Sequence, residues 1–306
     1  MKYYDLPKTD LKVSEIAFGC MRIADKSIEE VEELVKTALD CGINFFDHAD
    51  IYGGGKSEEL FGQVLEKHPE YREKMIIQTK CAIVPGKRYD FSKEYIMNAV
   101  NGSLKRLHTD HVEILLLHRP DALCDPQEVA EAFDELYVSG KVKYFGVSNH
   151  TPGQIALLQK YTKHPIIINQ LQLSIVHSVM IDSGMNMNMK EDFAIDKDGG
   201  VLDYCRLNDI TIQAWSIVQA SWAEGTFLNH PDYKKLNNVL DDLAKKYNVT
   251  PATIATAWIL RHPAHIQAIT GTTSPKHLIE TAEAANIELT RQEWYDLYLA
   301  SDKPLP

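Results

Sequence analysis

An aspartate, a tyrosine, a lysine and a histidine stand where apolar stretches of the sequence are expected to end as strands. Asp47 closes the apolar run 43–47, Lys80 closes 75–80 and His118 closes 112–118. Tyr52 follows Asp47 in a loop that continues into a run of three glycines. Polar groups at the junction between a strand and a loop indicate function, because binding loops are held in position by a rigid scaffold.

Together these four residue types could protonate a carbonyl oxygen. A phenol has a pKa of about 10, and a nearby ammonium favours the phenolate and lowers that pKa. Asp47 could pair with Lys80 and keep it charged, while the imidazole of His118 could orient the carbonyl. Such a group is an acid catalyst for a developing alkoxide. The reaction would also require a hydride donor on the other face of the carbonyl.

Each residue alone also has an ordinary structural interpretation. Asp47 could cap a loop, Lys80 could be a solvated strand end, and His118 could be a packed, hydrogen-bonded residue. The functional interpretation gains weight because further expected strands end in polar or stacking groups, namely Ser148 and Asn149, Gln170, Trp215 and Ser216, and Gly271 and Thr272. Alone, Gln170 could be a satisfied polar group and Trp215 a packing residue.

The elements that would position these groups alternate between strand and helix. Continuously apolar strands are expected at 16–19, 43–47, 75–80, 112–118, 142–148, 166–170, 211–215 and 266–270. Eight such repeats favour one (β/α)8 TIM-barrel domain over residues 1–306, with a short N-terminal β-hairpin and extra C-terminal helices. An open doubly wound sheet is the alternative, but no G-x-G-x-x-G follows any strand. Residues 173–199 and 216–231 are expected to be irregular.

Composition limits the possible partners and the compartment. The 306-residue chain carries a net charge of −11, which argues against nucleic acid and anionic membranes as partners. Its five cysteines form no C-x-x-C pair, and residues 1–10 contain no apolar signal segment, so we expect a cytoplasmic protein. Dispersed histidines and the absence of H-E-x-x-H argue against a metal site.

Several motifs resemble the aldo-keto reductase superfamily, in the order that the family has them. They are FDHADIYG at 46–53, TK at 79–80, LLLHRP at 115–120, GKV at 140–142 and GVSN at 146–149. The resemblance spans nearly the whole chain. It implies a (β/α)8 barrel that reduces small-molecule aldehydes or ketones with NADPH. By position, Tyr52 would be the general acid, Asp47 and Lys80 would tune it, and His118 would orient the carbonyl.

The same resemblance implies a set of residues for NADPH or NADP+. Ser148, Asn149 and Gln170 would bind the nicotinamide amide, and Trp215 would stack under its ring. The loop over the pyrophosphate would begin at Ser216 and Val218, and the adenosine 2′-phosphate end would be held by Gly271, Thr272, Thr273, His277, Glu280 and Thr281.

Two features depart from the family pattern. His277 stands where many members have an arginine, and Thr281 stands where an asparagine is frequent. Because His277 is a weaker, pH-dependent cation, NADH remains the less favoured alternative donor. Ser216 is followed by Ile217 in place of proline, so that loop can differ in shape.

Two other functions remain open from the sequence, as do the substrate, the reaction direction and the oligomeric state. One is a regulatory barrel subunit that binds NADPH as a redox sensor, although such a protein need not keep all four acid-site residues. The other is a Schiff-base enzyme that uses Lys80, which an aspartate partner would disfavour by keeping the amine protonated. The methionines of 173–199 could form an adaptable wall for a bulky substrate or be incidental residues of a mobile loop.

Overall fold

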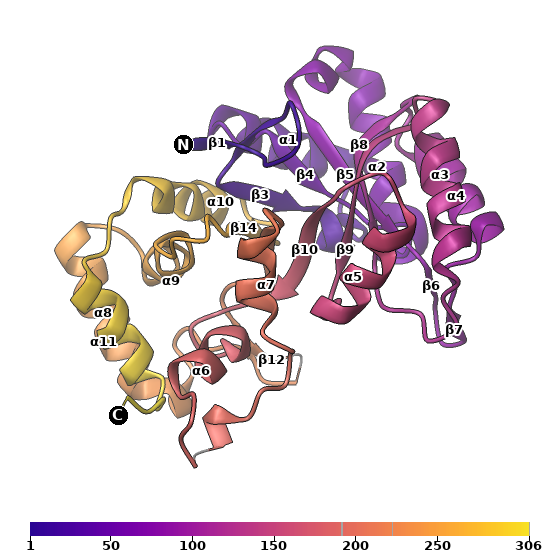
Figure 1. The fold of residues 1–306 in the computed structure, drawn as a ribbon. Coiled ribbons are helices and arrows are strands. Elements are labelled where there is room, and N and C mark those ends of the chain that lie inside the picture. The colour runs from indigo at the N-terminus through magenta and orange to yellow at the C-terminus, as the bar shows by residue number, and fades with distance from the viewer. Residues whose placement is uncertain (191, 222, 306) are drawn as a thin grey trace.

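Eight parallel strands form a closed barrel (Figure 1). The structure is a computed structural model that describes residues 1–190, 192–221 and 223–305. Around the wall the order is β10 (Ile166–Gln172), β11 (Thr211–Trp215), β14 (Gln267–Thr270), β3 (Ile16–Gly19), β4 (Phe45–Asp47), β5 (Ile76–Cys81), β8 (Val112–Leu117) and β9 (Val142–Ser148). The predicted (β/α)8 barrel is therefore confirmed, and the open-sheet alternative is wrong.

Helices connect these strands and cover the barrel. They are α1 (Ile28–Asp40), α2 (Lys56–Lys67), α3 (Lys93–Arg106), α4 (Pro126–Val138), α5 (Pro152–Tyr161), α7 (Val201–Leu207), α8 (Lys234–Tyr247), α9 (Pro251–Leu260), α10 (Pro275–Ala282) and α11 (Arg291–Ala300). Helix α11, which follows α10 in the sequence, lies beside α8 (Figure 1). None of the helices in the described part is long and apolar enough to cross a membrane.

Local sequence signals fix where several helices begin. Ser27 and Glu30 form a capping box at α1, and the Ser92 hydroxyl caps α3. Such caps satisfy backbone N–H groups that have no partner within the helix. Pro251 occupies the first turn of α9, where its missing N–H costs nothing. These caps set the ends of the loops that carry polar groups to one mouth of the barrel.

Two segments expected to be irregular contain regular structure. The insert after β10 includes α6 (Val179–Met185), whose Met180 and Ile181 are buried. The loop after β11 contains an antiparallel pair, β12 (Gln219–Ser221) and β13 (Gly225–Thr226). A further hairpin of β6 (Ile83–Val84) and β7 (Arg88–Tyr89) follows β5. Positions 191 and 222, in these expected irregular segments, and 306 lie outside the described residues. Short elements of this kind carry too little periodicity to be predicted.

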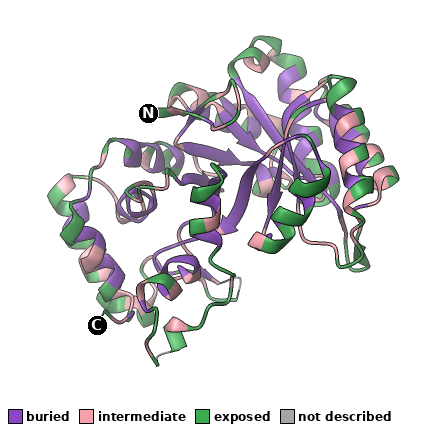
Figure 2. Cartoon of the chain, in the orientation of Figure 1, coloured by how far each residue is buried: buried purple, intermediate pink, exposed green. Residues whose placement is uncertain are grey.

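The buried residues form two clusters. The larger lies between the barrel and its helices, while the smaller fills the barrel interior. The expected N-terminal hairpin, β1 (Tyr3–Asp5) with β2 (Lys12–Ser14), contributes to the smaller cluster through Val13, and its turn contributes Leu6. Figure 2 shows buried strands surrounded by helices with exposed outer faces. The hairpin therefore packs into the interior core, and the polar groups gather where the strands end.

Candidate active site

Tyr52 is positioned by a turn that strongly favours glycine at three successive positions. After β4 the chain enters a 3₁₀ turn, Tyr52–Gly55, in which Gly53, Gly54 and Gly55 have φ values of +58°, +66° and +95°. Other residues rarely adopt this region of backbone space. A Cβ on Gly53 would also stand 2.3 Å from the Ala24 Cβ. The glycine run therefore allows the chain to turn from Tyr52 into α2 within three residues.

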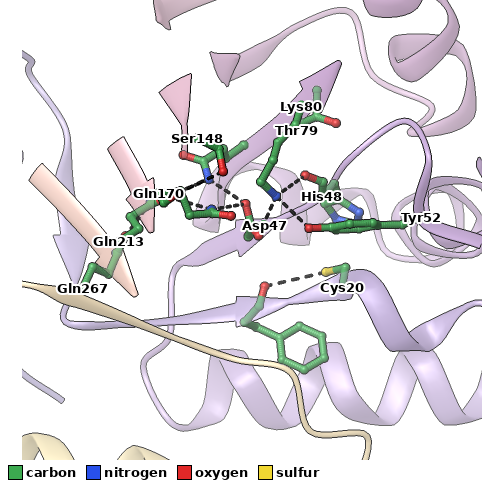
Figure 3. Close-up of polar contacts among 12 residues, drawn as sticks. Cys20, Asp47, His48, Tyr52, Thr79, Lys80, Ser148, Gln170, Gln213 and Gln267 are labelled. Atoms are coloured by element: carbon green, nitrogen blue, oxygen red, sulfur yellow. Dashed lines mark hydrogen bonds and ion pairs between the residues drawn. The ribbon is translucent and has the colours of Figure 1, made fainter. Parts of the chain in front are cut away.

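The amine of Lys80 lies at the centre of the site (Figure 3). It donates to Asp47 Oδ2 at 2.8 Å, to the His48 carbonyl oxygen at 2.8 Å and to the Tyr52 hydroxyl at 3.0 Å. Asp47 is paired with Gln78 across β4 and β5, and Lys80 lies two residues further along β5 on the same strand face. The structure thus brings the predicted trio into direct contact.

A row of buried glutamines holds Asp47 from the side opposite the lysine. Gln78 Nε2 donates to Asp47 Oδ1 at 2.6 Å, and Gln170 Nε2 donates to the same oxygen at 3.0 Å. Gln213 Oε1 accepts from both amides, at 2.9 and 3.0 Å, and its own Nε2 donates to Gln267 at 2.7 Å. These bonds cross β5, β10, β11 and β14, and the residues involved are buried. Both oxygens of Asp47 are consequently occupied.

Burial and charge together set the protonation states. Desolvation raises the pKa of Tyr52, and this outweighs the lowering by Lys80. The sequence argument was therefore correct about the effect of the lysine and wrong about the net direction. For Lys80, burial alone would lower the pKa, but Asp47 and Tyr52 raise it overall. The site holds a protonated phenol hydrogen-bonded to an ammonium, so Lys80 is a poor Schiff-base nucleophile.

His118 stands beside the phenol as a neutral imidazole. Its ring lies edge-to-face with Tyr52 at a centroid distance of 6.0 Å. Burial, with smaller contributions from Lys80 and Arg119, holds the pKa of His118 well below its usual range. Its Nδ1 is enclosed and has no hydrogen-bond partner among the described residues. The tautomer with the proton on Nε2 therefore places the donor on the less enclosed side of the ring.

A cavity of about 900 Å³ opens over this group. Asp47, Tyr52 and His118 line it, whereas Lys80 lies fully buried behind them. The predicted cofactor residues that also line it are Ser148, Asn149, Gln170, Trp215, Ser216, Val218, Gly271, Thr272, His277, Glu280 and Thr281. Thr273 is not in the lining. The structure thus gathers residues more than 200 positions apart in the sequence around one space.

Two residues of the expected nicotinamide region have unusual backbone conformations. Asn149 and Ser216 have φ values of +59° and +57°, a region that few non-glycine residues adopt. Asn149 Nδ2 donates to Ser148 Oγ at 2.8 Å, and Ser148 Oγ donates to the Gln170 carbonyl oxygen at 2.9 Å. Ser216 Oγ donates to Gln219 at 2.9 Å. Strained conformations of this kind concentrate at binding sites.

The far end of the cavity meets the beginning of α10. Ser274 caps this helix by accepting from the His277 backbone N–H, and the first-turn amides there favour an anion. The Thr281 hydroxyl donates to the His277 carbonyl oxygen at 2.8 Å, so it is engaged within its own helix. Thr250, Pro251 and Ala252, at the start of α9, line the same end and were not foreseen.

Sequence reasoning also missed part of the lining near Tyr52. These residues are Met21, Arg22, Ile51, Ile83 and Arg119. Arg119 directly follows His118 and lay within a recognised motif, so its position beyond a strand end was an available signal. No residue of 173–199 appears in the described lining, so the methionines give no support to the substrate-wall interpretation. Among the described residues, no three His, Cys, Asp or Glu side chains are grouped to hold a metal ion.

The comparisons agree with this architecture. The aldo/keto reductase family model matches residues 15–298, and the chain belongs to that family of oxidoreductases. A 6-dehydroglucose reductase of Novosphingobium aromaticivorans is 35% identical, over 98% of this chain and 95% of the relative. The oxidoreductase YdhF of Escherichia coli is 33% identical, over 94% and 93% respectively. A thermostable aldo-keto reductase solved with the inhibitor epalrestat has a TM-score of 0.79 and 27% identity, over 98% of this chain and 100% of that one.

Proposed function

We propose that this protein reduces aldehydes or ketones to alcohols with NADPH, and that Tyr52 supplies the proton. The observation that carries the proposal is the chain of contacts from Asp47 through Lys80 to the Tyr52 hydroxyl, at 2.8 and 3.0 Å, at the floor of a large cavity. A buried phenol with a raised pKa stays protonated at neutral pH and is available as an acid.

Each acid-site residue has a distinct task in this proposal. His118 donates from Nε2 to the substrate carbonyl oxygen and holds it beside the phenol. The Tyr52 O–H bond breaks as its proton passes to that oxygen, and the phenolate that remains is stabilised by the Lys80 ammonium. Asp47 keeps the ammonium charged and fixed. The row of glutamines holds Asp47, and solvent later restores the phenol proton.

The opposite half of the cavity fits a dinucleotide. When bound, NADPH supplies the hydride for the carbonyl carbon. Ser148, Asn149 and Gln170 would hold its nicotinamide amide, since Gln170 uses its Nε2 on Asp47 and Gln213 and has Oε1 left to accept. Trp215 would face the ring, and the first turn of α10 would face the phosphate.

The preference for NADPH over NADH rests on the α10 end. The helix amides and His277 offer positive character there, and Lys276 pairs with Glu280 at 3.8 Å. An exposed histidine is a weaker anion partner than arginine. We therefore expect NADPH to be favoured over NADH, by a smaller margin than an arginine at position 277 would give. Parallel assays with both donors, for wild type and His277→Arg, measure that margin.

Tyr52→Phe tests the proposed chemistry. The variant removes one hydroxyl and leaves the ring packing with His118 intact. We expect carbonyl-dependent oxidation of NADPH to fall by about 10²–10⁴-fold, the usual value of a positioned acid. NADPH binding, followed by quenching of tryptophan fluorescence, should stay near the wild-type value.

Two results would count against the proposal. Turnover of Tyr52→Phe close to wild type would remove Tyr52 from the chemistry. If the wild-type protein bound NADPH but no aldehyde, ketone or quinone led to its oxidation, the regulatory-subunit function would be favoured.

A further inference from the structure

The residues that line the mouth of the barrel fall into two halves, according to the strands that carry them. The expected cofactor residues that line the cavity lie at or after β9, β10, β11 and β14, which are contiguous in the wall. The acid group lies at or after β4, β5 and β8, and β3 lies next to β4. The second half of the lining consists of Gly19, Met21, Arg22, Asp47, Ile51, Tyr52, Gly53, Ile83, His118 and Arg119. A substrate that reaches Tyr52 meets this half.

The charge on the substrate half comes from two arginines. Asp47 is the one carboxylate in its described lining, and both Asp47 oxygens are already bonded. Arg22 and Arg119 form no ion pair or side-chain hydrogen bond with any described residue. The carboxylate nearest Arg119 in sequence, Asp121, is engaged by the backbone amides of Phe91 and Leu123, both at 2.9 Å. These guanidinium groups are therefore available.

Their placement suits a ligand bound across the acid group. Arg22 follows β3 and Arg119 follows β8, and β4 and β5 lie between those strands in the wall. Tyr52 follows β4, so the arginines stand on either side of it along the rim. Arg119 is half-buried, lines the cavity and directly follows His118, which places it at the reacting end; its charge also contributes to the lowered pKa of His118. Arg22 is more exposed.

Two unpaired cations in one cavity are unexpected in a protein with a net charge of −11. The other walls here are the apolar side chains of Met21, Ile51 and Ile83, which offer no partner. For the half-buried Arg119, a charge without a partner is costly, and a bound anion would offset that cost. Arginine also matches carboxylate and phosphate groups through paired N–H donors.

We propose that this site selects carbonyl substrates that carry an anionic group, a carboxylate or a phosphate, and that Arg119 binds the group while Arg22 adds to its attraction from the rim. The inference deepens the proposed carbonyl reduction and rests on it. The apolar walls would hold the carbon skeleton between the anion and the carbonyl at Tyr52.

Two matched pairs of aldehydes test the inference. One is para-formylbenzoate against its neutral methyl ester, and the other is glyceraldehyde phosphate against glyceraldehyde. Wild type, Arg119→Gln, Arg119→Lys and Arg22→Gln are compared by kcat and KM for each aldehyde at saturating NADPH. Arg88→Gln is the matched control, because Arg88 is an exposed arginine outside this cavity, paired with Asp90.

We expect wild type to prefer the anionic member of each pair. Arg119→Gln should lower kcat/KM for the anionic aldehydes by about 10- to 100-fold, the value of a charge-assisted hydrogen bond. The loss should appear mainly in KM, because the anion is bound equally in the ground and transition states. Neutral aldehydes should change little, Arg119→Lys should recover part of the loss, and Arg22→Gln should lose less.

The outcomes separate this inference from the proposed function. Equal losses on the anionic and neutral members would show that Arg119 positions His118 or the fold, and would overturn anion selection. Preference for one anionic pair alone would identify carboxylate or phosphate as the group bound. If wild type reduced the neutral aldehydes with no anionic preference, this inference would fail while carbonyl reduction stood. If wild type reduced none of the four and no other aldehyde, ketone or quinone, the proposed function would fail first.

Discussion

Two buried lysines of this protein have similar surroundings, but their pKa values are shifted in opposite directions. Lys80 lies in the barrel mouth with Asp47 and Tyr52, and its amine is 4.9 Å from the Tyr52 ring centroid. Lys303 lies in the C-terminal segment near Asp182, with its amine 5.2 Å from the Tyr298 ring centroid. Their side chains are 0% and 4% exposed. Each therefore combines an ammonium, a carboxylate and an aromatic ring away from water.

The distance to the carboxylate separates the two sites. Lys80 contacts Asp47 at 2.8 Å, and its pKa is raised although burial alone would lower it. Lys303 lies 3.8 Å from Asp182, whose Oδ1 accepts a hydrogen bond from Ser178 at 2.7 Å. The amine of Lys303 donates instead to neutral oxygens, the Ile175 carbonyl and the Ser178 hydroxyl.

The consequence is a lysine with a perturbed pKa outside the cavity over Tyr52. Burial lowers the pKa of Lys303 to about 8, with Asp182 offsetting only part of the effect. A perturbed pKa is a guide to active sites only in combination with a cavity and a reacting partner. Lys303 lines no part of the cavity over Tyr52. It joins the C-terminal segment to α6, which is a structural role.

The largest effect is expected for Lys80→Met. Without the ammonium, the phenolate left by proton transfer loses its stabilising charge, and Asp47 keeps a buried negative charge without a counterion. We expect kcat to fall by about 10²–10⁴-fold and the free energy of unfolding to fall by about 3–5 kcal/mol. Steady-state turnover and denaturant unfolding measure the two effects separately.

The double variant Lys80→Met, Asp47→Asn sharpens that prediction. Removing both charges should recover much of the stability, since the buried charge without a partner is gone, while turnover should remain low. A double variant as unstable as the single one would show that the ion pair is not what Lys80 contributes to the fold.

The barrel could be predicted from the sequence because its signals are long and repeated. Eight apolar runs alternate with helices, and residues that favour helix starts, Ser27, Ser92 and Thr151, cap α1, α3 and α5. Helix α6 and the hairpin β12–β13 were missed, since seven-residue and two- or three-residue elements show no clear periodicity. Their formation depends on contacts with distant parts of the chain.

The part of the site that lies at strand ends could be predicted from the sequence. The contacts of Lys80 with Asp47 and Tyr52 were anticipated, because neighbouring strands end at one mouth. The glutamine row was not, since Gln78 and Gln213 read as ordinary residues inside strands. The net pKa direction of Tyr52 also needed the structure, because the sequence shows which charges are near but not how deeply the phenol is buried.

A smaller effect with a distinct pH dependence is expected for Lys303→Met. The pKa of Lys303 is about 8 in the folded protein and about 10.4 in an unfolded chain. Between those values the unfolded chain binds more protons, so the contribution of Lys303 to stability rises with pH. We expect wild type to gain about 2–3 kcal/mol relative to the variant between about pH 8 and about pH 10. Denaturant unfolding of both proteins across that range measures the difference.

Turnover provides the second half of that test. Because Lys303 lies outside the cavity lining, Lys303→Met should retain carbonyl reduction close to wild type at neutral pH. A stability difference that stayed constant with pH would mean that the ammonium of Lys303 is as stable inside the protein as in water. The pKa of Lys303 would then not be lowered by burial, and the contrast with the raised pKa of Lys80 would no longer hold.

The smallest effect is expected for Lys235→Met, although its ion pair is the shortest of the three. Lys235 lies 2.6 Å from Asp302, the residue next to Lys303, but the two side chains are 76% and 69% exposed. Water and salt screen such a pair, so its loss should cost at most about 1 kcal/mol and less still at high salt. Unfolding free energies at low and high salt, measured beside Lys303→Met, test this ranking. A cost of Lys235→Met equal to that of Lys80→Met would mean that contact distance ranks these pairs. The expected order holds only if burial, more than contact distance, determines how much each ion pair stabilises the protein.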